Sequence, residues 1–296
     1  MAKTKTWRGK TGGTRGMQLT LIRWFRHIDT RWILPLTALW VLGSVLFMRK
    51  ERRAAWHYWR RRQHKKPLAA CLAVWQQFFA MSHVVLDRFA AYAGQHFQVH
   101  TDDRDDIMQR VQHGEEGFII LSSHVGNQEL AGYCTKSVKP LRIVVFLSDT
   151  PTVNSERERL FENNRLHYLP IEPDGSHIFD MHQALQQGEG LSIHGDRMFS
   201  DSRSLKTELL GAEASFPEGP FRIAAAERVP VVTMFMLRTG HNRYELRIRS
   251  LSRPEDETLN TKQLAQALLE RYAHEMEQVL LVRPEQWFNF FEFWTE

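Results

Sequence analysis

The stretch GFIILSSHVGNQELAGY, residues 117–133, joins a short apolar run to a polar turn and a second element. Residues 117–123 are typical of a buried β-strand, because the run is short, apolar and opened by glycine. We expect a helix to begin near Asn127, directly after the turn that holds His124 and Gly126. A strand followed at once by a helix is the repeating unit of an α/β layer structure.

The same alternation continues on both sides of this stretch. We expect further strands at residues 141–148, 190–195, 229–237 and 242–250, and amphipathic helices at residues 67–91 and 259–281. Strands separated by helices indicate an α/β fold with a mostly parallel central sheet flanked by helices.

Composition limits the class of protein. The chain has 296 residues, of which 43% are hydrophobic and 25% charged, so it can bury a real core and is not disordered throughout. Its only two cysteines, Cys71 and Cys134, exclude a disulfide scaffold and a four-cysteine zinc site. A location facing the cytosol follows most simply from this cysteine content.

The charge is distributed unevenly along the chain. Residues 1–66 hold 17 Lys or Arg against two acidic residues, a net charge of +15, whereas the other 230 residues hold 22 basic and 32 acidic groups. A segment this basic favours a polyanionic partner, which is either nucleic acid or an anionic membrane.

An apolar stretch inside the basic segment favours the membrane. Residues 32–48, WILPLTALWVLGSVLFM, carry no charge, and basic residues flank them on both sides. As a helix they would span about 25 Å against a hydrocarbon core of about 30 Å, which leaves a spanning and an interfacial helix both open. We therefore predict an N-terminal membrane-anchoring helix here, with a buried soluble helix as the alternative, and two domains at residues 1–66 and 67–296.

The turn after the first strand carries the candidate chemistry. Ligands gather at the carboxyl ends of strands in open α/β sheets, which is where His124 lies. Glu129 follows five residues later, from where its carboxylate could reach Nδ1–H of the imidazole and leave Nε2 as a base. Ser122 and Ser123 are interpreted as strand-end residues, since no G-x-S-x-G elbow surrounds them. A structural histidine beside a surface glutamate is the alternative.

HVGNQE at residues 124–129 resembles the H-x-x-x-x-D/E signature of the lysophospholipid acyltransferase superfamily, in its branch of bacterial lipid A lauroyl/myristoyl acyltransferases. Three further segments are similar to this branch in order and context: LDR at 86–88, GLSIHGDRMFSD at 190–201 and PEQWFNFFEFW at 284–294. The resemblance covers most of the chain from about residue 30.

The resemblance implies a membrane-associated acyltransferase that uses neither a metal nor a cofactor. A fatty acyl chain would pass from the thioester of acyl carrier protein or acyl-CoA to a hydroxyl or amine of a lipid or glycolipid acceptor. The site would lie on the cytoplasmic side of a bacterial inner membrane, with an anionic membrane and no nucleic acid as partner. His124 would be the general base and Glu129 the residue that orients it.

The resemblance also suggests residues that bind substrate. Asp196 and Arg197 follow a predicted strand, and the arginine could pair with a phosphate or carboxylate of the acceptor or with the phosphopantetheine of the carrier. Gly126 and Asn127 complete the predicted substrate-binding set. His194 lies within the strand pattern and could point the other way.

Two functions of other classes stay open. The first is a metal-dependent hydrolase that uses His124, Glu129, His194 and Asp196 as ligands, although no H-E-x-x-H pattern is present. The second is a nucleic-acid-binding module built on the basic segment, which the apolar stretch and the acidic remainder of the chain disfavour.

Overall fold

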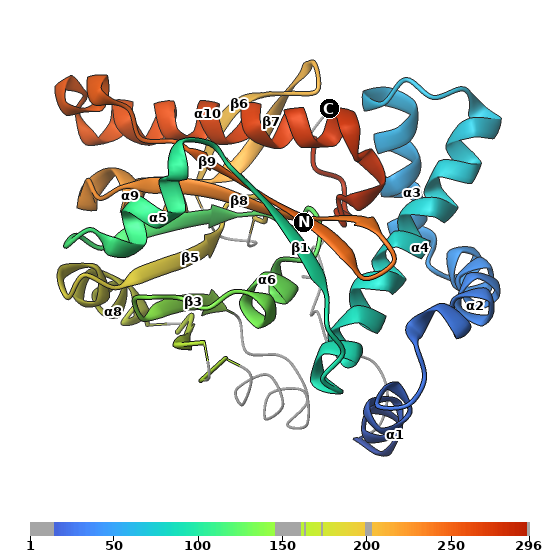
Figure 1. The fold of residues 1–296 in the computed structure, drawn as a ribbon. Coiled ribbons are helices and arrows are strands. Elements are labelled where there is room, and N and C mark those ends of the chain that lie inside the picture. Colours follow the sequence, from blue (N-terminus) through green and yellow to red (C-terminus); the bar gives the residue numbers. More distant parts are fainter. Residues whose placement is uncertain (1–14, 146–160, 163, 173, 199–202, 295–296) are drawn as a thin grey trace.

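The computed structural model describes residues 15–145, 161–162, 164–172, 174–198 and 203–294 (Figure 1). Three predicted segments extend outside the described residues. They are the beginning of the basic N-terminal segment, the last part of the strand predicted at 141–148, and the last part of the loop within 190–201.

The described residues form a seven-stranded sheet with the strand order β1-β9-β8-β2-β5-β3-β4, in which each strand is hydrogen-bonded to its neighbours in this order. Only β8 and β9 are antiparallel, and the other pairs are parallel. The strands are β1 (Gln98–Asp103), β2 (Phe118–Ser122), β3 (Leu141–Val145), β4 (Leu166–Pro170), β5 (Gly190–His194), β8 (Val231–Gly240) and β9 (Arg243–Ser250). The predicted α/β fold with a mostly parallel sheet is confirmed.

The five strands predicted from the sequence are the five interior strands of the sheet, β2, β3, β5, β8 and β9. The sequence analysis missed both edge strands, because β1 (sequence QVHTDD) is largely polar and exposed and β4 (sequence LHYLP) carries a histidine and a proline in five residues. It also missed an antiparallel hairpin of β6 (Ser204–Leu209) and β7 (Ala212–Pro217), which forms a separate two-stranded sheet. Edge and hairpin strands bury one face at most, so a continuous apolar run does not mark them.

Alternate side chains of β2 enter two different hydrophobic cores. Ile119 and Leu121 lie in one core, and Phe118 and Ile120 in the other. The first core is covered by α4 (Pro67–Tyr92), α8 (His177–Gln186), α9 (Glu218–Glu227) and α10 (Thr261–Val282). The second is covered by α5 (Ile107–His113) and α6 (Gln128–Cys134). The strand is therefore buried on both faces, which explains its unbroken apolar sequence.

The N-terminal helices lie together on one side of the sheet (Figure 1). They are α1 (Arg15–Phe25), η1 (Thr30–Trp32), α2 (Leu34–Phe47), α3 (Arg49–His57), the π-helical turn η2 (Tyr58–Arg62) and α4. Ala55, Tyr58 and Trp59 belong to the same hydrophobic core as the central strands. The arrowheads of β3 and β5 point toward this side, so the carboxyl edge of the sheet faces α3 and α4 (Figure 1).

Most of the apolar stretch 32–48, in which the sequence analysis predicted a membrane anchor, forms α2, which begins at Leu34 and ends at Phe47. Val41 is buried, whereas Leu36, Leu39 and Trp40 are each more than 70% exposed. Among the described helices, only α4 is long and apolar enough to cross a membrane by length and composition, and one third of its apolar window is buried. Buried core helices of soluble proteins meet the same criterion.

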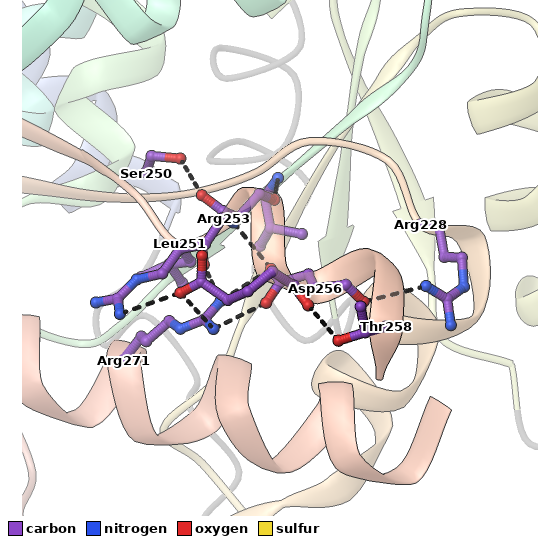
Figure 2. A network of polar contacts seen from close by, with 10 residues as sticks. Arg228, Ser250, Leu251, Arg253, Asp256, Thr258 and Arg271 are labelled. Carbon is purple, nitrogen blue, oxygen red and sulfur yellow. Dashed lines mark hydrogen bonds and ion pairs between the residues drawn. The ribbon is translucent and has the colours of Figure 1, made fainter. Parts of the chain in front are cut away.

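A polar cluster closes the opposite end of the sheet, where β9 leads into α10 (Figure 2). Arg271 of α10 forms an ion pair with Asp256, with 2.8 Å between Nη2 and Oδ1, and Nη1 donates to the Leu251 carbonyl at 2.8 Å. The backbone N–H of Arg253 donates to Asp256 Oδ2 at 2.9 Å. These contacts fix the connection between the last strand and the last long helix.

Candidate active site

Two neighbouring parallel strands deliver the central residues of the site. β2 ends at Ser122 and β5 ends at His194, and these two residues are paired in register. The backbone N–H of Gly195 donates to the Ser122 carbonyl at 2.9 Å, which continues the pairing past the ends of both strands. His124 and Asp196, each two residues beyond its strand, are therefore brought together at the carboxyl edge of the sheet.

His124 is held by the carboxylate of Asp196 through two contacts. Nδ1 lies 2.8 Å from Oδ1, and the backbone N–H of His124 donates to Oδ2 at 2.8 Å. Asp196 is buried, whereas the His124 side chain is 29% exposed. A carboxylate on Nδ1 favours the tautomer with hydrogen on that nitrogen, so Nε2 can accept a proton from a bound molecule.

The carboxylate that contacts Nδ1 of His124 belongs to Asp196, whereas the sequence analysis expected Glu129 there. Glu129 lies in the first turn of α6, where Arg88 Nε is 2.9 Å from Oε2 and Tyr92 donates to Oε1 at 3.1 Å. The Tyr133 hydroxyl also donates to Oε1. The ends of adjacent strands place Asp196 Oδ1 2.8 Å from Nδ1, the position that the sequence analysis expected for the carboxylate of Glu129.

The environment of Asp196 keeps this residue ionised. Burial by itself raises the pKa of the carboxyl, but the charge and hydrogen bond of His124 outweigh burial, and the pKa lies well below its usual range. Trp287 Nε1–H also donates to Oδ2, at 3.3 Å. A permanent carboxylate at this place stabilises an imidazolium when His124 takes up a proton.

His194 faces the same site. Its ring centroid is 4.6 Å from that of His124, with 41° between the ring planes, so of the two directions that the sequence left open His194 takes the one toward His124. Burial, and to a smaller extent the charge of the neighbouring His124, lowers the pKa of His194 to about 3. His194 is therefore a neutral imidazole at physiological pH and adds no charge beside the base.

Gly126 and Asn127, both predicted to bind substrate, have structural contacts. The N–H of Gly126 donates to the Gln286 carbonyl at 2.8 Å, and the N–H of Asn127 donates to the Met236 carbonyl at 2.7 Å. Gly126 has a φ of +74°, and a Cβ atom there would lie 2.1 Å from the Met236 oxygen, so only glycine fits. Asn127 Oδ1 accepts from the N–H of Leu130 and caps α6, which begins where the sequence predicts. Their contact with substrate stays a prediction.

Arg197 lies next to Asp196 in the chain, and its guanidinium carbon lies 5.7 Å from the centre of the Phe291 ring. Burial lowers the pKa of Arg197, and the neighbouring Asp196 opposes this effect.

The two serines before His124 are buried: Ser122 Oγ lies 3.4 Å from the Ile193 carbonyl, and Ser123 Oγ accepts from the Val125 N–H at 3.2 Å. Both serines are strand-end residues, as the sequence indicates.

The four ligands of the alternative metal-dependent hydrolase do not converge. His124, His194 and Asp196 are neighbours, but Glu129 is paired with Arg88 and two tyrosines. Among the described residues, no group of three or more His, Cys, Asp or Glu side chains has a geometry that could hold a metal ion.

A histidine whose Nδ1 is bound to a carboxylate at the carboxyl edge of a parallel sheet is an arrangement suited to general-base catalysis. The sequence model of the bacterial lipid A biosynthesis acyltransferases matches residues 70–296, and the chain belongs to this family. It is an acyltransferase of lipid biosynthesis, as the resemblance predicts.

Comparisons with solved structures and with curated proteins find little further similarity in sequence. Among solved structures, the chain is similar to the 1-acyl-sn-glycerophosphate (LPA) acyltransferase PlsC of Thermotoga maritima, with 15% identity and a TM-score of 0.36. The similarity covers 89% of this chain and 97% of that one. No curated protein matches the sequence.

Proposed function

We propose that the protein transfers a fatty acyl chain from a thioester to a hydroxyl or amine of a lipid or glycolipid, with His124 as the general base. The observation that carries this proposal is the 2.8 Å contact between His124 Nδ1 and the buried carboxylate of Asp196. Residues 67–296 would form the acyltransferase domain, and residues 1–66 would attach it to the membrane.

The proposed reaction needs no covalent enzyme intermediate. Nε2 of His124 takes the proton from the acceptor group while its oxygen or nitrogen attacks the thioester carbonyl. The new ester or amide bond forms, the carbon–sulfur bond breaks, and the proton returns from His124 to the departing thiolate. Asp196 stabilises the imidazolium between these two proton transfers.

Arg197 is the cation that we propose for substrate recognition. It follows Asp196 directly, and an arginine suits the planar oxygens of a phosphate or carboxylate. Such a group occurs both in the phosphopantetheine of a carrier and in many lipid headgroups. Since the N–H groups of Gly126 and Asn127 donate within the protein, a developing oxyanion would need another donor.

We propose acyl carrier protein or acyl-CoA as the donor and purified acyl thioesters as the test. The wild-type protein should move a labelled acyl chain from one of these thioesters into a membrane lipid extract. His124→Ala should lose about a thousandfold or more in rate while keeping its circular dichroism spectrum and melting temperature. Undiminished turnover by His124→Ala would contradict the role of this residue, and no transfer by the wild type would contradict the proposed function.

We further propose that α2 attaches the protein to an anionic bilayer, with the catalytic domain on the cytoplasmic side of the inner membrane. At about 21 Å, the fourteen-residue helix is shorter than a hydrocarbon core of about 30 Å, so its helical part alone does not cross the membrane. Its exposed apolar side chains can enter the membrane, while the exposed Arg49, Lys50 and Arg53 meet anionic headgroups.

Sedimentation with vesicles that contain phosphatidylglycerol tests this attachment. Leu39→Glu combined with Trp40→Glu should weaken vesicle binding about tenfold or more, because both side chains are 72% exposed on α2. Phe179→Glu is the matched control, since Phe179 is 68% exposed on α8 and should leave vesicle binding unchanged. Equal losses in both variants, or binding to DNA in place of vesicles, would refute the proposed attachment.

A further inference from the structure

We infer that Trp287 and Gln77 are positioning residues, which hold the carboxylate of Asp196 and through it the His124 ring. This inference rests on the proposed function, in which His124 is the base. Neither residue is close to His124 in the sequence, and the contacts that connect them come from the C-terminal segment and from α4.

Residues 286–288 run beside the loop that carries His124. The Gln286 carbonyl accepts from the N–H of Gly126 at 2.8 Å, and the N–H of Phe288 donates to the His124 carbonyl at 2.9 Å. Val125 and Trp287 are paired between these two hydrogen bonds as an antiparallel bridge. The backbone of the C-terminal segment therefore fixes the backbone of His124 on both sides of that bridge.

The side chain of Trp287 reaches the carboxylate directly. It is 1% exposed, and Nε1–H donates to Asp196 Oδ2 at 3.3 Å. Asp196 also accepts hydrogen bonds from the ring and the backbone N–H of His124. A buried carboxylate needs donors that fix its rotation, and the indole N–H is the one donor of these three that lies outside the His124 loop.

Gln77 fixes Trp287 from the other side. It is fully buried on α4, and Nε2 donates to the Trp287 carbonyl at 2.6 Å. Gln77 Oε1 in turn accepts from Trp59 Nε1–H at 2.9 Å. Buried hydrogen bonds thus connect Trp59, Gln77, Trp287, Asp196 and His124 in this order, from the N-terminal helices to the base.

The C-terminal segment offers a second tryptophan as a control for packing. The Trp294 ring lies 5.7 Å from the Trp287 ring, but Trp294 Nε1–H donates to the Leu209 carbonyl at 3.2 Å and not to Asp196. Replacing either tryptophan with phenylalanine removes an indole N–H and part of a ring. Only the change at Trp287 removes a donor to the site.

Full-length protein carrying Trp287→Phe or Trp294→Phe should be compared in the acyl-transfer assay. We expect Trp287→Phe to lower kcat about tenfold with KM unchanged within about twofold, because a hydrogen bond to a charged group is lost without a loss of binding area. Trp294→Phe should retain the wild-type kcat and KM. Equal losses in the two variants, or an unchanged kcat in Trp287→Phe, would overturn the inference.

A spectroscopic measurement separates this inference from the proposed function. In protein labelled with ¹⁵N-histidine, the His124 ring should show the Nδ1–H tautomer, with the signal assigned by its loss in His124→Ala. Trp287→Phe and Gln77→Met should each shift this signal toward a mixture of tautomers, whereas Trp294→Phe should not. A wild-type signal in Trp287→Phe would overturn the positioning role, even if the protein transferred no acyl chain.

A double-mutant cycle tests whether the two residues act in one chain. Because Gln77 acts through Trp287, the combined variant should lose no more kcat than the more impaired single variant. Multiplied losses in the double variant would overturn the connection. Trp59→Phe removes only the most distant donor and should cost less in kcat than Gln77→Met, which keeps the inference testable if Gln77→Met does not fold.

Discussion

Two buried carboxylates lie at opposite ends of the same sheet and differ in their partners. Asp196, beyond the carboxyl end of β5, is bound to the imidazole of His124 at 2.8 Å. Asp256, next to the start of β8 and the end of β9, is bound to the guanidinium of Arg271 at 2.8 Å (Figure 2). The pKa of both carboxyls lies below its usual value, because these partners outweigh the effect of burial.

The partner decides what each carboxylate can do. An arginine keeps its proton at every physiological pH, so the pair of Asp256 and Arg271 can hold structure but cannot exchange a proton. An imidazole takes up and releases a proton near neutral pH, and its second nitrogen stays available to a substrate. An open pocket of about 220 Å³ adjoins Arg253 and Arg271, yet the groups suited to proton transfer lie at the other end of the sheet.

Among changes to the carboxylates and their partners, Asp196→Asn should have the largest effect. We expect a loss of about a hundredfold or more in kcat, because the amide no longer stabilises the imidazolium or selects the tautomer. The rate of acyl transfer by protein shown to be folded measures this effect. Asp256→Asn is the control and should keep kcat, so a similar loss in both variants would remove the distinction between the two carboxylates.

Glu129→Gln sharpens the comparison, because Glu129 lies near the active site but has an arginine partner as Asp256 does. We expect kcat to fall about tenfold and the melting temperature to fall as well, since the pair with Arg88 connects α6 to α4. Steady-state kinetics and thermal unfolding should be measured on the same preparation. If kcat fell as far as in His124→Ala with no loss of stability, Glu129 would have a direct catalytic role.

Arg271→Met breaks the structural pair alone. We expect the free energy of unfolding to fall by about 3 kcal/mol, because Asp256 is left as a buried carboxylate without its main partner. Urea unfolding measures the change, and kcat of the folded protein should stay at the wild-type value. A stability equal to that of the wild type would show that the cluster does not hold α10 to the sheet.

The smallest expected effect is the pH dependence of stability. The pKa of Asp196 and of Asp256 is lower in the folded protein than the pKa of about 3.9 that an aspartate has in the unfolded chain. Each carboxylate therefore contributes stability at pH values above the unfolded pKa, and this contribution is lost as the pH falls through the folded pKa. The difference in unfolding free energy between wild type and Asp196→Asn should therefore shrink by roughly 1 kcal/mol from pH 7 to pH 3, and the difference for Asp256→Asn should shrink in the same direction. A difference that grows on acidification would contradict the assigned direction.

The strands that could be predicted are those with apolar runs. β2, β5 and β8 are buried on both faces and were found from their composition, and α4 and α10 from their amphipathic pattern. β1 was missed because a strand at the edge of the sheet tolerates the polar sequence QVHTDD. The start of α6 was predictable because its capping residue, Asn127, is local in sequence.

The candidate site was predictable in part. His124 was identified from its place after a buried strand, and Asp196 was included as a residue that binds substrate and as a ligand of the alternative metal site, but not as the partner of His124. The spacing to Glu129 suggested the wrong orienting carboxylate, because spacing along a chain says nothing about groups on a neighbouring strand. Trp287 lies in the segment 284–294 that the resemblance singled out, but nothing local in the sequence connects it or Gln77 to Asp196, because those contacts form only through the folded C-terminal segment and α4.

By itself, the sequence determined the α/β class, the position of the candidate base and the family, since each depends on residues that are adjacent or regularly spaced. The tertiary structure alone decided which carboxylate contacts Nδ1 of His124, that His194 lies against its ring, and that the Trp287 indole donates to Asp196. The physical reason is the pairing of β2 with β5, which places the ends of two strands about seventy residues apart within hydrogen-bonding distance.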